Sequence, residues 1–212
     1  RWGQHGDRSL MPVRKGQPWG APAPMPDDGV VVTTDAELRS IVEDARHRGG
    51  AIPVFGLLGG DLCRTLGGTG DPGRLRSEEA MTFPVDAGAV IADGRLHWFV
   101  AHLVARSRLW RRAFVAMNAQ WYGEWNLGPR AHPGDGLLDS YDARVPVKDL
   151  WKVRARLRHG THLPHPGITE RRITAIQVSF DRSLPLELDG VAVGRARNLS
   201  VRVEPDAFRV VV

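Results

Sequence analysis

Apolar residues occupy every second position through much of the C-terminal segment, and this pattern limits the possible folds more than any other feature. Four runs have this period: Ile176, Val178 and Phe180; Leu184, Leu186 and Leu188; Leu199, Val201 and Val203; and Phe208, Val210 and Val212. Successive side chains of a strand point to opposite faces of a sheet, so alternation with polar residues indicates one buried face and one solvated face. The segment therefore predicts four antiparallel strands.

The preceding segment also indicates β-structure. Three further stretches are strand candidates: 85–91, 96–100 and 113–118. Asp93-Gly94 lies between the first two, and Asp-Gly is a strong signal for a tight hairpin turn. One helix is predicted over residues 147–158, where Leu150, Val153 and Leu157 share a face. We expect a two-layer antiparallel β-sandwich with this helix packed on it.

Residues 30–80 instead predict a small α/β unit. Val30 to Val32 form a short apolar run that suits a buried strand. Thr34 is followed three residues later by Glu37, which is the capping-box pattern of a helix start. A glycine pair ends this helix, and residues 51–55 form a second apolar run. Two strands joined by a helix are therefore expected.

The chain divides into three parts on these patterns. Residues 1–29 contain five prolines, which exclude regular helix and central strand, so an extended Pro-rich arm is expected. Residues 30–80 form the α/β unit and residues 81–212 the β-sandwich. The predicted fold class is α+β.

Composition limits the location and the partners. No apolar stretch approaches the ~20 residues that a membrane-spanning helix needs. The single cysteine, Cys63, rules out an internal disulfide framework and favours a reducing compartment. We therefore expect a cytoplasmic protein, and the alternative is a cytoplasmic protein attached peripherally to a membrane. The net charge of +5 favours an anionic partner: nucleotide, acidic lipid or nucleic acid.

Basic residues gather in two places, around Trp110 and around Trp151. Most charge runs are solvated helix or loop surfaces. Tryptophan, however, favours the boundary between apolar and aqueous environments, so binding to an acidic lipid surface is a second interpretation. The candidate lipid-surface residues are Arg108, Trp110, Arg111, Lys152 and Arg156.

The segment 128–139, GPRAHPGDGLLD, resembles a signature of diacylglycerol kinases, bacterial lipid kinases and sphingosine kinases. In that family a Gly-rich turn leads to a Pro-x-Ala stretch and then to Asp-Gly-x-Leu-Asp. The similarity continues in order over residues 81–212, including Gly160-Thr161-His162 and the terminal strands. It implies a β-rich C-terminal domain and ATP-dependent phosphorylation of a lipid hydroxyl, with Mg²⁺.

The resemblance also implies roles for two aspartates. Asp189-Gly190 matches the family's Asp-Gly-Glu, in which the aspartate is the general base, although Val191 stands in place of the glutamate. Asp135 matches a residue that supports a structural Mg²⁺ site in some bacterial members. A turn explains either aspartate without any catalytic or metal-binding role, since Asp-Gly favours hairpin turns.

The nucleotide-binding part is less similar. The segment 56–67, GLLGGDLCRTLG, matches the family's second loop, so Gly59, Gly60 and Asp61 are candidate phosphate-binding residues, with an N-cap as the ordinary role of Asp61. Asp35 matches the aspartate of the family's Gly-Gly-Asp-Gly-Thr. Its ordinary role is that of a first-turn acid, because the neighbouring glycines are replaced.

These sequence features lead to three candidate functions. The first is a catalytically impaired lipid-kinase-family protein that binds a ligand or an acidic lipid surface, with no cofactor. The second is an active minimal kinase with ATP and Mg²⁺, completed by a homodimer. A nucleic-acid-binding module ranks last, because it rests on charge alone. A metal site at His159, His162 and His165 is disfavoured, because prolines interrupt the spacing.

Overall fold

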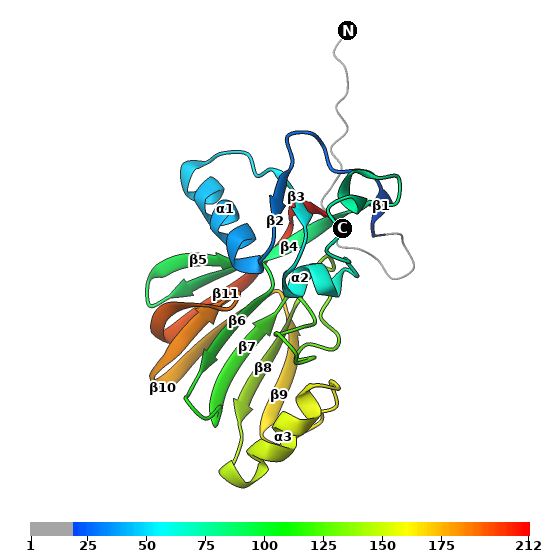
Figure 1. Cartoon of the computed structure of the whole chain (residues 1–212). Helices are drawn as coiled ribbons and strands as arrows, with labels where there is room; N and C mark the ends of the chain where they lie inside the picture. Colours follow the sequence, from blue (N-terminus) through cyan, green and yellow to red (C-terminus); the bar gives the residue numbers. More distant parts are fainter. Residues whose placement is uncertain (1–18) are drawn as a thin grey trace.

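The computed structural model describes residues 19–212, so most of the predicted Pro-rich arm lies outside the described residues. The eleven strands of the described part form one sheet (Figure 1). They are β1 Ala21–Pro22, β2 Val30–Val32, β3 Val54–Leu57, β4 Met81–Ala92, β5 Arg95–Phe99, β6 His102–Arg106, β7 Arg112–Met117, β8 Leu138–Arg144, β9 Ile168–Ile173, β10 Ala175–Leu188 and β11 Val191–Val211.

The main path through the sheet is β1-β4-β11-β10-β6-β7-β8-β9, and β5 adds to β4. Three helices accompany it: α1 Asp35–Arg48, α2 Gly60–Thr65 and α3 Leu150–Leu157. Single 3₁₀ turns occur at Arg74–Arg76 and Val147–Asp149. None of the helices in residues 19–212 is long and apolar enough to cross a membrane.

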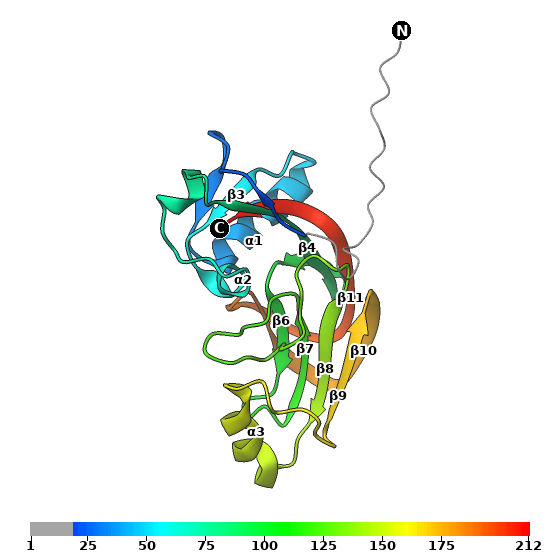
Figure 2. The same cartoon turned by 90° about the vertical axis from the view of Figure 1, so that its right-hand side faces the viewer.

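The four strands predicted at the C-terminal end are in fact two long strands. β10 and β11 each run through an irregularity, between Ser179 and Leu184 in one and between Glu204 and Phe208 in the other. Such bulges bend a strand without ending its hydrogen-bonded ladder. The polar interruptions in the sequence therefore mark bends. Figure 2 shows the curved path of β11.

Much of the bent sheet encloses one apolar core, and a second apolar core lies under α1 and α2. Side chains of all strands from β4 to β11 contribute to the first core, with Phe99 and Phe114 among the largest that are fully buried. Strands far apart on the path, such as β4 and β9, therefore face the same interior, which is the sandwich arrangement expected from alternating strands. The predicted α+β fold class is confirmed.

The α/β unit extends the same sheet. β2 and β3 are parallel, and β3 pairs with the end of β11 in parallel. Helix α1 begins as predicted: the Thr34 side chain accepts a hydrogen bond from the Glu37 N–H at 3.1 Å. The Glu37 carboxylate in turn accepts from the Thr33 N–H at 2.9 Å. Gly49, with a φ of 65°, ends the helix in the left-handed conformation.

Helix α3 lies at the other end of the molecule from α1 and α2 (Figure 1). Its buried residue, Leu157, packs with Val115 and Tyr141 of strands β7 and β8. The predicted helix over 147–158 begins with a 3₁₀ turn, so its regular part is shorter than expected. A short turn, residues 107–111, joins β6 to β7. The basic residues of this turn therefore lie beside α3.

Candidate functional site

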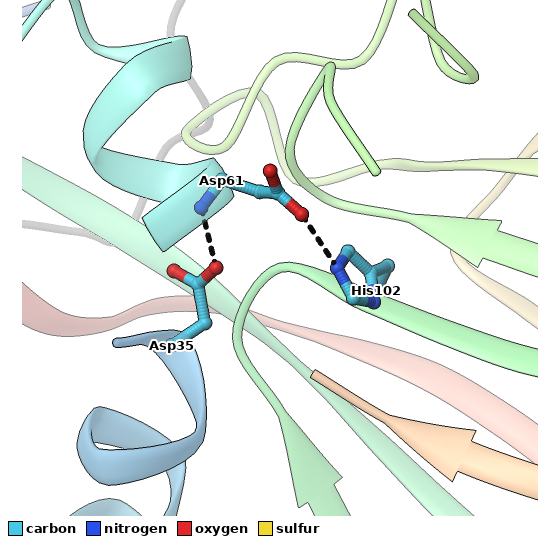
Figure 3. Close-up of side chains that lie close together, drawn as sticks. All are labelled: Asp35, Asp61 and His102. Atoms are coloured by element: carbon cyan, nitrogen blue, oxygen red, sulfur yellow. Dashed lines mark hydrogen bonds and ion pairs between the residues drawn. The ribbon is translucent and has the colours of Figure 1, made fainter. Parts of the chain in front are cut away.

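A cleft of about 420 Å³ lies where α1 and α2 meet the sheet. Its lining residues come from distant parts of the chain: Thr34, Asp35, Gly60, Asp61, His102, Tyr122, Gly123, Glu187, Asp189 and Gly190. Four of the residues predicted from the sequence are among them, namely Asp35, Gly60, Asp61 and Asp189. Figure 3 shows how Asp35, Asp61 and His102 face one another.

Asp35 starts α1, but its carboxylate binds the start of α2. Its Oδ2 accepts a hydrogen bond from the Asp61 N–H at 2.5 Å, and its Oδ1 accepts from the Leu62 N–H at 3.2 Å. These are amides of the first turn of α2, which have no partner within the helix. Burial, assisted by the nearby charge of Asp189, raises the pKa of Asp35 to about 7.

Gly60 is required by this contact. Its φ is +93°, a conformation that side chains rarely adopt, and an added Cβ would lie 2.5 Å from Oδ1 of Asp35. Gly59 is the N-cap of α2, and a Cβ there would lie 2.4 Å from the carbonyl oxygen of Thr33. The glycine pair thus lets α2 approach both the Asp35 carboxylate and the preceding strand end.

Asp61 connects α2 to the sheet. Its Oδ2 lies 3.0 Å from Nε2 of His102, and the carboxylate also accepts from the Gly123 N–H at 2.9 Å. His102 is the first residue of β6 and is buried. Burial alone would lower the pKa of His102, but the hydrogen bond to Asp61 and the charge of Asp189 raise it above its ordinary value.

Asp189 occupies the turn between β10 and β11, as the Asp-Gly signal predicts, with a φ of 49°. Its carboxylate accepts hydrogen bonds from the N–H groups of Val100, Ala101 and His102, at 3.0, 2.8 and 3.0 Å. Nε of Arg39 lies 3.7 Å away. Burial raises the pKa of Asp189, although the charge of His102 opposes this shift. The carboxylate thereby fixes the β10–β11 turn to the β5–β6 connection.

Three lining side chains have roles that were not predicted from the sequence: His102, Tyr122 and Glu187. The Tyr122 hydroxyl donates a hydrogen bond to Oε1 of Glu187 at 2.6 Å, and the Tyr122 ring lies edge-on to that of His102. Glu187 lies near the end of β10, two residues before Asp189 of the following turn. The closeness of Glu187 to the Asp189-Gly190 turn was the one available signal for it.

Asp135 is not among the lining residues of this cleft. Its Oδ1 accepts from the Leu137 N–H at 3.0 Å, which is a turn contact, and its other oxygen is paired with Arg172. Both carboxylate oxygens thus have protein partners. The turn explanation offered for this residue accounts for its surroundings, and its predicted metal role stays a prediction.

Asp35, Asp61 and His102 are the residues that could hold a divalent cation, since one ligand atom from each lies within 4.8 Å of the others. A nucleotide triphosphate fits less well. The N–H groups of Asp61 and Leu62, at the start of α2, already donate to Asp35. These two N–H groups are therefore not free to bind a phosphate.

The predicted lipid-surface residues lie elsewhere, around a second cavity of about 260 Å³ between α3 and strands β7 and β8. Arg108 and Trp110 line it. Arg111 lines an adjoining groove, while Lys152 and Arg156 are exposed on α3. The cavity walls are mostly apolar, and exposed Trp151 and Leu109 belong to its lining.

One sequence comparison identifies the family of the chain. Residues 79–212 match the family model described as the YegS C-terminal NAD kinase beta sandwich-like domain. No curated protein matches the chain.

The structural comparisons find diacylglycerol kinases of Bacillus anthracis str. Sterne. One such structure has a TM-score of 0.57 at 12% identity, and the match covers 86% of this chain and 75% of that chain. Two others assigned to the same class have TM-scores of 0.61 and 0.58 at 12% and 14% identity. Their matches cover 86% of this chain and 77% and 76% of theirs. At such identities the likeness shows the fold.

Replacing Gly60 with alanine should test the contact between α2 and Asp35. We expect Gly60→Ala to unfold at a lower urea concentration than Gly67→Ala. Both positions have positive φ, so each alanine costs ~1 kcal/mol of strain, but only the Cβ at 60 meets the Asp35 carboxylate. Nothing lies within 4 Å of a Cβ at Gly67. Equal midpoints for the two variants would contradict the contact.

The raised pKa of Asp35 should make the folding free energy depend on pH. The pKa of Asp35 is about 7 in the folded state and near its ordinary value of 3.8 in the unfolded state, so the folded state holds the proton to a higher pH. Stability from this group is therefore present at low pH and is lost as the pH rises between these values, by at most ~1.4 kcal/mol per pH unit. Urea unfolding with a chelator present should show that Asp35→Asn lacks this slope.

The matched control is Asp44→Asn, which changes an exposed carboxylate of the same helix. It should keep the pH slope of the wild type. If Asp35→Asn keeps the same slope as well, then Asp35 is not the group responsible.

Proposed function

Because the chain belongs to the family of the YegS C-terminal NAD kinase beta sandwich-like domain, we propose that it is a diacylglycerol-kinase-like protein without phosphoryl-transfer activity, which binds an amphiphilic ligand at an acidic lipid surface. The family matches confirm the resemblance inferred from the sequence. The loss of activity and the lipid binding are the proposal, and they rest on the arrangement of the cleft and of the second cavity.

The hydrogen bonds from α2 to Asp35 carry the first half of the proposal. Phosphoryl transfer depends on holding the phosphates with backbone amides and cations, because the protein does little covalent chemistry itself. Here the Asp35 carboxylate accepts the hydrogen bonds of the Asp61 and Leu62 N–H groups. A phosphate at the same place would have to displace the Asp35 carboxyl group. At any pH at which this carboxyl is ionised, its negative charge would also repel the phosphate.

The surroundings of Asp189 support the same conclusion. A general base must reach the proton that it removes, either directly or through one water molecule. The Asp189 side chain is fully buried, and its two oxygens accept three backbone N–H groups. Its position suits a role in holding the β10–β11 turn, and a lipid hydroxyl would reach it only after a rearrangement.

The second cavity supports lipid binding. An apolar space beside α3 has Arg108 and Arg154 among its lining residues, and α3 exposes Lys152 and Arg156 nearby. Ligand sites are commonly apolar hollows with a few placed polar groups. The exposed Trp151 ring is suited to the boundary between lipid headgroups and chains. This arrangement matches an amphiphile with an apolar chain and an anionic head.

One observation favours an active kinase instead. The His102–Asp61 pair lies in the cleft, and a histidine hydrogen-bonded to a carboxylate is a common proton acceptor in catalysis. In that case His102, rather than Asp189, would receive the proton of the lipid hydroxyl. An activity measurement separates the two functions.

We expect no detectable kinase activity. Calorimetric titration with Mg-ATP should give no binding heat, and labelled phosphate should not transfer to diacylglycerol, sphingosine or a mixed lipid extract. A micromolar dissociation constant or robust turnover would overturn this half of the proposal. In the event of turnover, Asp189→Asn and His102→Gln identify the base, since loss of a general base costs ~10²–10⁴ in rate.

We expect the protein to sediment with anionic vesicles and much less with neutral ones, and to be released by salt. Each basic residue near an anionic surface contributes about 1 kcal/mol, so Lys152→Gln with Arg156→Gln should weaken binding about 30-fold. The matched control, Arg48→Gln with Arg95→Gln, removes two exposed charges near α1 and β5. Equal weakening by both pairs would indicate attraction by net charge alone.

A further inference from the structure

His162 is a buried histidine whose two ring nitrogens both lack a hydrogen-bond partner. It follows α3 after the turn at Gly160 and is 2% exposed. Its ring lies edge-on to that of Tyr141, with 6.1 Å between the ring centroids. The same residue lines the apolar cavity beside α3. An unpaired polar side chain therefore borders a space large enough for a ligand.

Leaving these nitrogens unpaired is costly. A buried donor or acceptor without a partner costs about 1–3 kcal/mol, so native structures pair nearly all of them. Burial lowers the pKa of His162, which keeps the imidazole neutral near pH 7. A neutral imidazole has one N–H donor and one acceptor nitrogen. It is suited to pair with an uncharged hydroxyl or carbonyl group.

The other polar groups of the cavity do not offer this pairing. Tyr141 is the other fully buried polar lining residue, and its hydroxyl lies 3.5 Å from Oε1 of Glu170. Arg154 lies over the ring of Trp125, and both Arg108 and Arg154 are exposed. The cationic groups are thus on the solvent side, while His162 provides hydrogen-bonding capacity in the interior.

We infer that this cavity binds a short apolar ligand whose buried end carries a hydroxyl or carbonyl group paired with His162. The inference rests on the lipid-binding half of the proposed function and names the ligand class. The volume, about 260 Å³, lies just below the ~300–1,000 Å³ of drug-sized pockets, which favours a short chain. An anionic head at the other end of the ligand would meet Arg108 and Arg154.

Two matched probes test the inference: octanoate and 8-hydroxyoctanoate. They share the anionic head and the chain, and differ in one hydroxyl at the far end. An extra hydroxyl should weaken binding to a purely apolar pocket, because it must leave water. With His162 as partner, we expect 8-hydroxyoctanoate to bind about 2–10-fold more tightly by calorimetry, as one hydrogen bond contributes ~0.5–1.5 kcal/mol.

Substitution at His162 should reverse this preference. His162→Phe retains an aromatic ring and removes both nitrogens, so octanoate should become the tighter ligand. His162→Gln retains a donor and an acceptor and should keep the preference for the hydroxylated probe. A nitrogen NMR shift of the His162 ring in the wild type, seen with 8-hydroxyoctanoate and absent with octanoate, provides a measurement that needs no variant.

The outcomes separate this inference from the proposed function. Equal binding of the two probes, or tighter binding of octanoate to the wild type, overturns the role of His162 and leaves lipid binding intact. Binding of neither probe also overturns the inference, and vesicle sedimentation then decides the proposed function independently. A hydroxyl preference that persists in His162→Phe would place the hydroxyl at another group and overturn the pairing.

Discussion

The Asp35 carboxylate, held on the first turn of α2, is the contact on which the rest of the cleft depends. It joins the start of one helix to the start of another, 26 residues later in the chain. The contact needs a glycine at position 60, because any Cβ there would overlap the carboxylate. It also orients α2 so that the next side chain, Asp61, points to His102. One buried acid thus positions the remaining polar groups.

The charged groups of the cleft largely compensate one another. Four acids line it with His102, namely Asp35, Asp61, Glu187 and Asp189, and Arg39 lies beside Asp189. Like charges in a buried space raise one another's pKa, as Asp189 does for Asp35, and each aspartate is offset by backbone N–H groups or by histidine. This degree of internal pairing suits a rigid structural centre. It also explains why few donors in the cleft remain for an anionic substrate.

The sequence predicted local features well because short-range chemistry determines them. The Thr34 cap, the Asp189-Gly190 turn and the alternating strands all depend on residues close in the chain. The joining of four predicted strands into two was not predictable, because a bulge depends on the partner strand. The pairing of His102 with Asp61 spans 41 residues and has no motif. For Asp35, the family resemblance identified the residue, but only the fold shows that it caps α2.

The cleft and the apolar cavity share a wall. Tyr122 lines the cleft, and its ring packs against Trp110 and Trp125, which line the cavity, with centroids 6.0 and 5.9 Å apart. On the other side it contacts His102 at 4.9 Å. Packed side chains of this kind can transmit a displacement only if they have two discrete arrangements. The Tyr122 hydroxyl donates a hydrogen bond to Glu187, which holds the ring in the wall between the cleft and the cavity.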